Sequence, residues 1–391
     1  MVKEADALSN AGFDVTVLYS YWNQWGSDFT DQLLPAKKWK AVSVGGDPIK
    51  DTSTYFISRL IFTLAKWVIN LLGPLPYFTE IATSRSSYFL IRAAKKYPAD
   101  IYIAHNLGAL PAAIKAAKKH SAKCGFDAED FHRNETGNST TSLNYKLTKY
   151  IEDKYLPLTD HVTASSPQIT SRYKELYPAI DPVTILNVFP KTIVSKPPAE
   201  NTAGPIKIVW FSQTVGTNRG IDDTILALKQ LNSDNFELHL LGKASDEVKN
   251  TFKNMAGNAA KHIYFHEPVA PDDVIDLIAQ FDIGLASEPG FSINNQLALS
   301  NKIFTYLQAG LAIIASDTPA QQSFLAAYHE VGNLYPIKNT KAVADVLMSY
   351  DADRVKLFNT RQASLKLGTE QLNWENESVK FLNLVNKTLS S

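Results

Sequence analysis

The segment from Phe281 to Asp317, FDIGLASEPGFSINNQLALSNKIFTYLQAGLAIIASD, decides the fold of this 391-residue chain. It begins with a short apolar run, residues 282–286, that is typical of a buried parallel strand. A polar loop follows, and then a helix that Ser300 or Asn301 is expected to cap and Gly310 to end. A second apolar run forms the next predicted strand. The segment therefore predicts a strand–loop–helix–strand unit of a parallel α/β sheet.

This unit also predicts an anion site. The loop at the carboxyl end of the first strand contains Glu288 and Gly290, and ligands of open α/β sheets bind at that edge. The start of the following helix presents unpaired backbone N–H groups and a positive dipole end, and Lys302 adds a full charge. A corner with these properties suits a phosphate group.

The sequence SNKIFTYLQAGLAIIASD resembles the nucleotide-sugar corner of retaining glycosyltransferases of family 4, which have the two-domain GT-B fold. That family typically has two Glu residues separated by seven residues before the helix. Here Thr305 takes the place of the second Glu, and Glu288 is out of register with the first. The resemblance implies an α/β GT-B fold with two Rossmann-like domains facing across a cleft, and a ribose contact at Thr305. The alternative for this segment alone is any Rossmann-like unit with a capped helix.

Composition describes a soluble globular protein, with 45% hydrophobic and 20% charged residues. The 39 basic and 39 acidic residues balance, so the charge of the whole protein argues neither for nor against an anionic partner. No nucleic-acid partner is expected. The single cysteine, Cys124, fits a reducing cytoplasm, and the start of the sequence does not resemble a signal peptide. The sequence has no HExxH or CxxC motif, so neither a metal nor a cofactor is expected.

Charge and hydrophobicity coincide near the amino terminus. Residues 32–123 contain 14 Lys or Arg against 4 Asp or Glu, and they include the most apolar segment of the chain, residues 55–78. If residues 55–72 are helical, four polar residues form one narrow stripe on an otherwise apolar helix. These are Arg59, Thr63, Lys66 and Asn70. Such a helix either contacts the surface of a membrane at its inner face or packs against the domain with its stripe in water.

The first elements of the chain are predicted as a helix over residues 2–10 and a strand over residues 14–19. They resemble the first helix and second strand of the acceptor domain in family 4 enzymes, where another strand and a Gly-rich loop come first. We therefore expect the central slot for that first strand to be empty or filled otherwise. An empty slot would lower stability, because two strand edges would have unpaired backbone groups.

Two later strands are expected to end at polar clusters. Residues 99–104 lead to His105, and residues 123–126 lead to Asp127, Glu129 and Asp130. Both clusters resemble strand ends that line the interdomain cleft in family 4. His105, Glu129 and Asp130 are thus the candidate catalytic residues, one of them taking the acceptor's proton. The alternative is that the acidic residues only cap helices or lie in surface loops.

The domain boundaries follow from composition and resemblance. Residues 191–205 are rich in Pro and Gly and predict the linker. The acceptor domain is expected over residues 1–190, completed by a returning helix at 374–391. Residues 191–373 form the predicted nucleotide-sugar domain.

The resemblance also assigns donor residues in the second domain. Arg219 matches the second of two basic residues that contact the diphosphate, while the first falls at Gln213 or Thr214. Pro268 and Val269 lie where the family binds the base through backbone groups. The remaining expected contacts to the donor are Glu288, Gly290, Phe291, Ser300, Asn301, Lys302 and Thr305.

These expectations lead to a retaining glycosyltransferase of the hexosyltransferase type that needs no metal. It would transfer a sugar from a nucleotide-diphosphate sugar to a glycan or lipid-linked acceptor in polysaccharide biosynthesis. Two alternatives remain open. One is a catalytically impaired relative that binds nucleotide or glycan, which the neutral Thr305 and the missing basic residue favour. The other is a sugar-nucleotide epimerase of GT-B shape.

Overall fold

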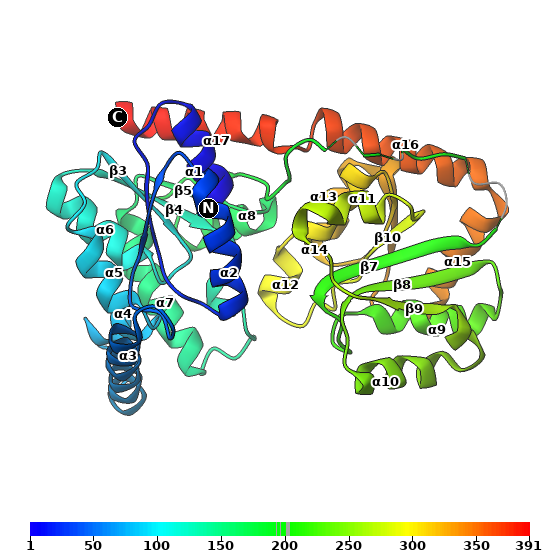
Figure 1. The fold of residues 1–391 in the computed structure, drawn as a ribbon, viewed down its shortest axis with the longest axis horizontal. Coiled ribbons are helices and arrows are strands. Elements are labelled where there is room, and N and C mark those ends of the chain that lie inside the picture. Colours follow the sequence, from blue (N-terminus) through cyan, green and yellow to red (C-terminus); the bar gives the residue numbers. More distant parts are fainter. Residues whose placement is uncertain (193, 196, 201–203) are drawn as a thin grey trace. The chain divides into compact units, whose positions relative to one another are not determined.

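A computed structural model of the chain describes residues 1–192, 194, 195, 197–200 and 204–391. The chain forms two compact α/β units, Met1–Ile185 with Ser378–Ser391 and Leu186–Glu377, each visible in Figure 1. The sequence placed the boundaries after residues 190 and 373, a few residues from these divisions. The predicted linker, residues 191–205, includes residues 193, 196 and 201–203, which lie outside the described residues.

The first unit contains six short parallel strands and the helices that cover them. Its strands are β1 (Thr16–Tyr19), β2 (Lys40–Ser43), β3 (Ile101–His105), β4 (Lys123–Ala128), β5 (His161–Ala164) and β6 (Val183–Thr184). Its helices are α1 (Val2–Asn10), α2 (Gln24–Leu33), α3 (Thr52–Leu72), α4 (Phe78–Ala82), α5 (Ser87–Ala94), α6 (Leu110–His120), α7 (Leu143–Tyr155) and α8 (Pro167–Leu176). The end of α17 (Trp374–Ser390) also belongs to this unit, where the Thr388 hydroxyl lies 3.0 Å from Nδ1 of His161.

The described strands of this unit form two separate ladders. Strands β1 and β2 pair in parallel, and β3, β4, β5 and β6 form a four-stranded parallel sheet in that order. In the family that the sequence resembles, one further strand would lie between these two ladders. The expectation that an empty central slot lowers the stability of the unit stays a prediction.

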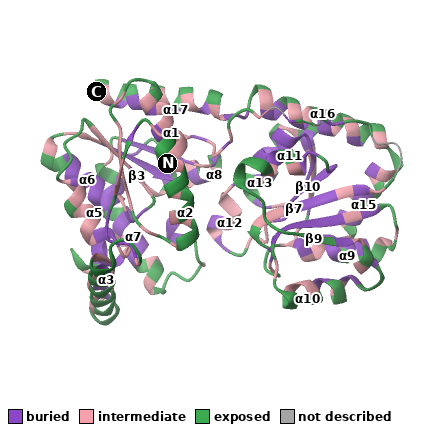
Figure 2. Cartoon of the chain, in the orientation of Figure 1, coloured by how far each residue is buried: buried purple, intermediate pink, exposed green. Residues whose placement is uncertain are grey.

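Helix α3 has the most exposed apolar surface of the first unit. The sequence predicted a helix over residues 55–72, and the structure has one from Thr52 to Leu72. Only Ser58, Ala65 and Ile69 are buried on it, so Figure 2 shows the helix largely in the colour of exposed residues. By length and composition alone α3 could cross a membrane, because it contains only two charged residues among its apolar ones. Of the two alternatives, packing of its apolar face against the domain does not hold for most of the length of the helix.

The second unit is a six-stranded parallel sheet between two layers of helices. Its strands are β7 (Ile206–Thr214), β8 (Phe236–Lys243), β9 (Ile263–His266), β10 (Ile283–Ala286), β11 (Ala312–Ser316) and β12 (Gly332–Tyr335). Its helices are α9 (Ile221–Leu231), α10 (Asp246–Ala256), α11 (Val274–Ile278), α12 (Ile293–Leu297), α13 (Asn301–Ala309), α14 (Pro319–Ala327), α15 (Thr340–Ala352) and α16 (Arg354–Glu370).

The order of these strands creates a switch point at the centre of the sheet. It runs β12-β11-β10-β7-β8-β9, so the chain builds one half outward from β7 and then returns to build the other half from β10. The loops that leave β7 and β10 therefore diverge at their carboxyl ends. Ligands of doubly wound sheets bind in the crevice that such a divergence opens.

Close packing fixes α13 against β10. A Cβ atom on Gly284 would lie 2.2 Å from the ring of Tyr306, so glycine allows the buried tyrosine to lie across the strand. The Tyr306 hydroxyl donates a hydrogen bond to the carbonyl oxygen of Leu285 at 3.0 Å. Gly310 ends the helix in the left-handed conformation with a φ of 66°. The strand–loop–helix–strand unit predicted from the sequence is confirmed.

A buried ion pair anchors the start of the same strand. The guanidinium group of Arg361, on α16, donates to Oδ1 of Asp282 at 2.8 Å and to the carbonyl oxygen of Phe281 at 3.0 Å. The other oxygen of Asp282 accepts from the backbone N–H of Lys207 at 2.9 Å. The switch-point strands are thus held in register at the edge opposite to the candidate site.

Candidate functional site at the switch point

The carboxylate of Glu288 is the centre of a polar cluster at the carboxyl end of β10. It accepts hydrogen bonds from the Ser300 hydroxyl at 2.8 Å, the Asn295 side-chain amide at 3.1 Å and the Lys302 ammonium group at 3.2 Å. The backbone N–H of Glu288 donates to the Ser316 hydroxyl at 2.8 Å. Glu288, which is out of register with the first Glu of the family motif in the sequence, therefore contacts the start of α13.

Charge pairing determines the electrostatics of this cluster. Burial alone would raise the pKa of Glu288, but the charge of Lys302 and the hydrogen bonds from Ser300 and Asn295 lower it below its ordinary value. The Lys302 ammonium group also lies 5.3 Å from the centre of the Trp210 ring, within cation–π range. Lys302 is thus fixed by two partners, with about a fifth of its side chain exposed.

Ser300 begins α13 without using its side chain as a helix cap. It is the N-cap residue, but its hydroxyl donates to Glu288 instead of accepting from the first turn. The first turn of α13 therefore has no side-chain cap. The anion-binding corner that the sequence predicted at this helix start stays a prediction.

Arg219 lies next to the same strand end through its backbone. Its carbonyl oxygen accepts a hydrogen bond from the Ser287 hydroxyl at 2.9 Å, and Ser287 directly precedes Glu288. Gly220 allows this approach, because its φ is 70° and an added Cβ atom would meet the Ser287 carbonyl oxygen at 2.6 Å. The Arg219 side chain is exposed. Its convergence with Lys302 on one diphosphate stays a prediction.

The other predicted donor residues differ in how they are placed. Thr305 is only 4% exposed, and its hydroxyl lies 3.4 Å from the Asn301 carbonyl oxygen, one helical turn earlier. Phe291 is 63% exposed, and Gly290 has a φ of 66° and donates its N–H to the Asn295 side chain. Thr305 is therefore a helix-packing residue in this structure, and its proposed ribose contact stays a prediction.

Several polar residues near the cluster were not singled out from the sequence. Ser316 donates its hydroxyl to the Glu288 carbonyl oxygen at 2.7 Å, and Asp317 accepts from the Ile337 N–H at 2.9 Å. Burial raises the pKa of Tyr335, and the charges of Asp223 and Glu288 add to this effect. All of these residues lie at or just after strand ends, which is the signal that would have identified them.

The predicted base-binding segment follows β9. Pro268 and Val269 are exposed after the strand, as a backbone contact would require. The Nε2 atom of His266 lies 2.9 Å from Nδ1 of His239, and the two rings stack with their centroids 5.2 Å apart. Burial lowers the pKa of His239 to about 4. The paired imidazoles indicate a structural role for His266.

In the first unit, His105 lies between two carboxylates. Its Nδ1 is 3.1 Å from Asp127 and its Nε2 is 3.1 Å from Glu4, while the Thr163 hydroxyl donates to Asp127 at 2.8 Å. Burial would lower the pKa of His105, but the bonds to Asp127 and Glu4 raise it to about 9. The two carboxylates therefore favour the protonated form of the imidazole. Asp127 and Glu4 are partners that the sequence did not assign.

These three side chains have ligand atoms within 4.8 Å of one another, as a metal site would. Both ring nitrogens of His105 already face carboxylates, and a protonated imidazole accounts for this geometry without a cation. Glu129 lies at the tip of the same sheet, where desolvation and the charge of Asp127 raise its pKa. Asp130 is half-buried beside it.

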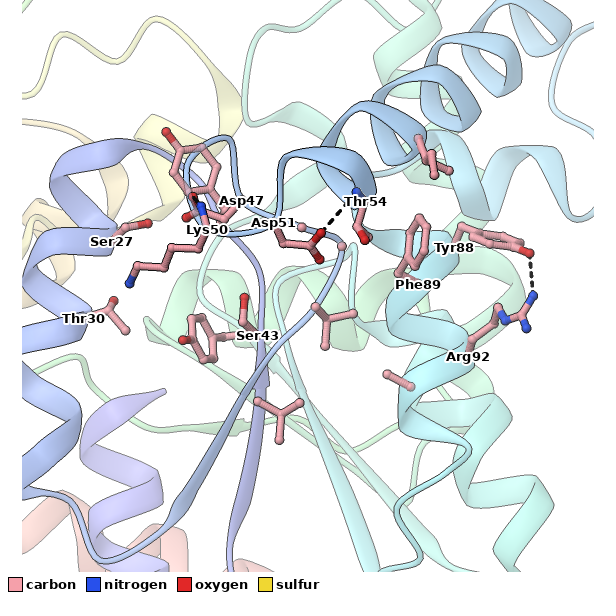
Figure 3. A pocket seen from close by; sticks show the side chains of 18 of the residues that line it. Ser27, Thr30, Ser43, Asp47, Lys50, Asp51, Thr54, Tyr88, Phe89 and Arg92 are labelled. Carbon is pink, nitrogen blue, oxygen red and sulfur yellow. Dashed lines mark hydrogen bonds between the residues drawn. The ribbon is translucent and has the colours of Figure 1, made fainter.

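The first unit also contains a pocket of about 820 Å³ over β1 and β2. Figure 3 shows side chains that reach it from α2, from the loop after β2, and from α5. Its lining is rich in hydroxyl, carboxylate and aromatic groups, including Ser27, Thr30, Ser43 and Asp51. Such a mixture suits a polar ligand with many hydroxyl groups.

Comparisons with known proteins agree with this geometry. Residues 205–350 match the family described as Glycosyl transferases group 1, while no curated protein matches the chain. A glycosyltransferase from Rickettsia africae ESF-5 is similar in structure, with 15% identity, a TM-score of 0.68, and coverage of 99% of this chain and 93% of that one. Anabaena HepE in complex with UDP has 13% identity, a TM-score of 0.71, and coverage of 99% and 95%. Sucrose-phosphate synthase from Thermosynechococcus elongatus has 12% identity, a TM-score of 0.69, and coverage of 99% and 92%. At these identities the structures establish the fold, and the predicted GT-B class is confirmed.

Proposed function

We propose that this chain, which contains a glycosyl transferases group 1 region over residues 205–350, is a retaining hexosyltransferase that uses a nucleotide-diphosphate sugar as donor. The observation that carries the proposal is the Glu288–Ser300–Lys302 cluster at the start of α13, with the backbone of Arg219 beside it. This is the edge of the sheet where the strand order switches.

Departure of a nucleoside diphosphate builds negative charge on its phosphate oxygens. The uncapped first turn of α13 offers its positive dipole end there, Lys302 adds a cation that is paired with Glu288 in this structure, and the exposed Arg219 offers a second cation. Preorganised charge of this kind lowers a barrier because it needs no reorganisation during the reaction. The mechanism proposed here needs no metal ion and no cofactor.

The donor itself is proposed as a uridine diphosphate sugar, supported by the UDP bound in the similar Anabaena structure. The exposed backbone of Pro268 and Val269 would contact the base, and Gly290 and Phe291 would lie near the sugar. Asn301, exposed in the first turn of α13, and Thr305 complete the proposed donor contacts.

For the acceptor, we propose a glycan or lipid-linked sugar that binds the pocket over β1 and β2 in the first unit. Its hydroxyl, carboxylate and aromatic lining supports this choice. Glu129 is the proposed base, because it lies at the strand end that the resemblance assigns to the acceptor, where desolvation and the charge of Asp127 raise its pKa above the ordinary value. Glu129 does not line this pocket, so the acceptor would extend from the pocket to the carboxylate. Its carboxylate partners favour the protonated form of His105, so it would orient or stabilise charge rather than remove a proton, and Asp130 would assist in binding.

The location proposed is the cytoplasm, with peripheral contact at the inner face of a membrane. The exposed apolar residues of α3 support this contact, since a lipid-linked acceptor would be delivered at that surface. A role in polysaccharide biosynthesis would follow from such an acceptor.

The proposal can be tested by incubating the enzyme with a panel of nucleotide sugars, with and without lipid-linked and glycan acceptors. We expect release of one nucleoside diphosphate to depend on acceptor, and NMR to show that the anomeric configuration of the donor is retained. The Ser27→Trp variant should block the acceptor pocket and reduce transfer while donor binding is unchanged. Inversion of configuration would contradict the retaining mechanism.

The same experiment separates the alternatives. A catalytically impaired relative, which the burial of Thr305 favours, would bind a nucleotide and release nothing. An epimerase would convert the donor sugar without any acceptor. Either result would replace the proposed function.

A further inference from the structure

A second pocket of about 640 Å³ lies on the first unit, among α4, α5 and α6. Five of its lining residues are cations: Arg92, Lys95, Lys115, Lys118 and Lys119. The rest of the described lining is apolar or aromatic and includes no Asp or Glu. A pocket that combines positive charge with apolar walls fits an anion attached to a hydrophobic group.

Only part of this charge is taken up by protein partners. The Lys115 ammonium group pairs with the buried carboxylate of Glu80, and Lys119 donates to the carbonyl oxygen of Lys95 at 2.7 Å. Arg92 donates to the Tyr88 hydroxyl at 2.7 Å, which leaves its charge unneutralised. The pocket therefore retains net positive charge, and a phosphate group would satisfy it.

Helix α3 packs against α4 and α5, two of the helices that line the pocket. Five large apolar residues follow helical spacing along this face: Phe56, Leu60, Leu64, Trp67 and Leu71. All are more than half exposed, and the basic residues Arg59 and Lys66 lie along one border of the face. Tyr77, which follows α3 and is 53% exposed, forms a wall of the pocket.

We propose that this pocket binds the phosphate headgroups of anionic phospholipids while the apolar face of α3 enters the membrane interface. The inference rests on the membrane contact proposed above and not on sugar transfer. A soluble phosphate would satisfy the cations but leave the α3 face in water. An anionic bilayer satisfies both, because its surface charge attracts the lysines and its acyl boundary covers Trp67 and its neighbours.

Vesicle flotation tests the proposal with the full chain. Wild-type protein is mixed with vesicles of phosphatidylcholine alone, or of phosphatidylcholine with phosphatidylglycerol, and bound protein is measured as lipid concentration rises. The pocket variant is Lys95→Ala/Lys118→Ala. Its matched control is Lys38→Ala/Lys146→Ala, which removes two exposed lysines from the same unit but outside the pocket. Melting curves confirm that each variant folds.

We expect the wild type to prefer anionic vesicles and the pocket variant to lose about 30-fold in affinity for them, since each lysine near the surface contributes about 1 kcal/mol. Binding to neutral vesicles should not change in the pocket variant, and the control should lose much less. The α3 variant Leu64→Gln/Trp67→Gln should lose binding to both vesicle types. Equal losses in the pocket variant and the control would overturn the headgroup site. Absence of wild-type binding to any vesicle would overturn the membrane contact itself, while donor turnover would still report on the proposed function.

Discussion

Replacing Lys302 with Met tests how the candidate donor site is held together. The substitution keeps the aliphatic stem and removes the charge that lies 3.2 Å from Glu288 and 5.3 Å from the Trp210 ring centre. A hydrogen bond to a charged group contributes about 1.5–3 kcal/mol, and an exposed cation–π contact about 0.5–1 kcal/mol. We therefore expect the second unit to lose about 2–4 kcal/mol at neutral pH. For a unit of this size each kcal/mol lowers Tm by about 2–4 °C.

The pH dependence of this loss identifies its cause. In the wild type the pKa of Glu288 is lowered, so its contribution to stability is present above the unfolded value of about 4.3 and is lost as pH falls through the folded value. Without Lys302, burial should raise that pKa, so the variant loses stability as pH rises through its folded value. The deficit should consequently be larger at pH 7.5 than at pH 4.5, and it should shrink further as the pH falls below the folded pKa of Glu288 in the wild type.

The assay is thermal unfolding followed by tryptophan fluorescence, with Lys302→Arg as the variant that retains the charge. Lys253→Met, which removes an exposed lysine from α10 of the same unit, is the control for losing any surface charge. An equal deficit at both pH values would refute the reasoning, because it would show that the charge of Glu288 is not what Lys302 stabilises.

Three further substitutions follow from the packing and the ion pairs. Arg361→Leu should destabilise the second unit by about 3–5 kcal/mol in urea unfolding, because it leaves Asp282 buried without its partner, and a loss below about 1 kcal/mol would contradict this. Gly284→Ala should cost about 1–3 kcal/mol by forcing a Cβ atom into Tyr306, whereas Gly137→Ala, with open space around it, should be nearly neutral, so similar effects at both sites would argue against the packing account. In the folded protein the pKa of His105 is raised to about 9, so its contribution to stability is complete below the unfolded value of about 6.5 and is lost as pH rises toward 9. The His105→Gln variant should therefore lack the decline in Tm over this range. A wild-type Tm that is constant from pH 6.5 to 9 would refute this prediction.

The parts of the fold that sequence reasoning predicted well are those with strong local signals. The apolar run before Ser287, the helical spacing of the apolar residues in α13 and the terminating Gly310 each specify one local conformation, and the structure has the expected elements. The helix at residues 2–10 agrees for the same reason, since Gly12 lies two residues after its last residue.

The environment of Glu288 was predicted less well, because register was counted along an extended loop. The short helix α12 folds within that loop and returns the chain, so Glu288 contacts Ser300 although twelve residues separate them in sequence. A linear spacing rule cannot represent such a fold-back. The contact of Asn295 with the same carboxylate depends on α12 as well.

Side-chain contacts between residues far apart in the sequence could not be predicted either. The protonated state of His105 depends on Glu4, about 100 residues away, and on Asp127 from the neighbouring strand. Likewise, the amphipathic pattern of α3 showed which residues are apolar but not whether the protein covers them. Hydrophobic periodicity reports the composition of a helix face, while exposure depends on tertiary packing.

The most direct test of the donor site is calorimetric titration of UDP into the wild type and the Arg219→Ala variant, with Lys253→Ala as control. Arg219 is exposed and its side chain can be removed without disturbing the core, so a change in affinity reports on the ligand rather than on folding. We predict one UDP per chain in the wild type, the same affinity in the control and at least about a tenfold loss in Arg219→Ala, as expected for a charge-assisted contact of about 1.5–3 kcal/mol. Unchanged UDP affinity in Arg219→Ala, or no binding of UDP by the wild type, would contradict the assignment of this site.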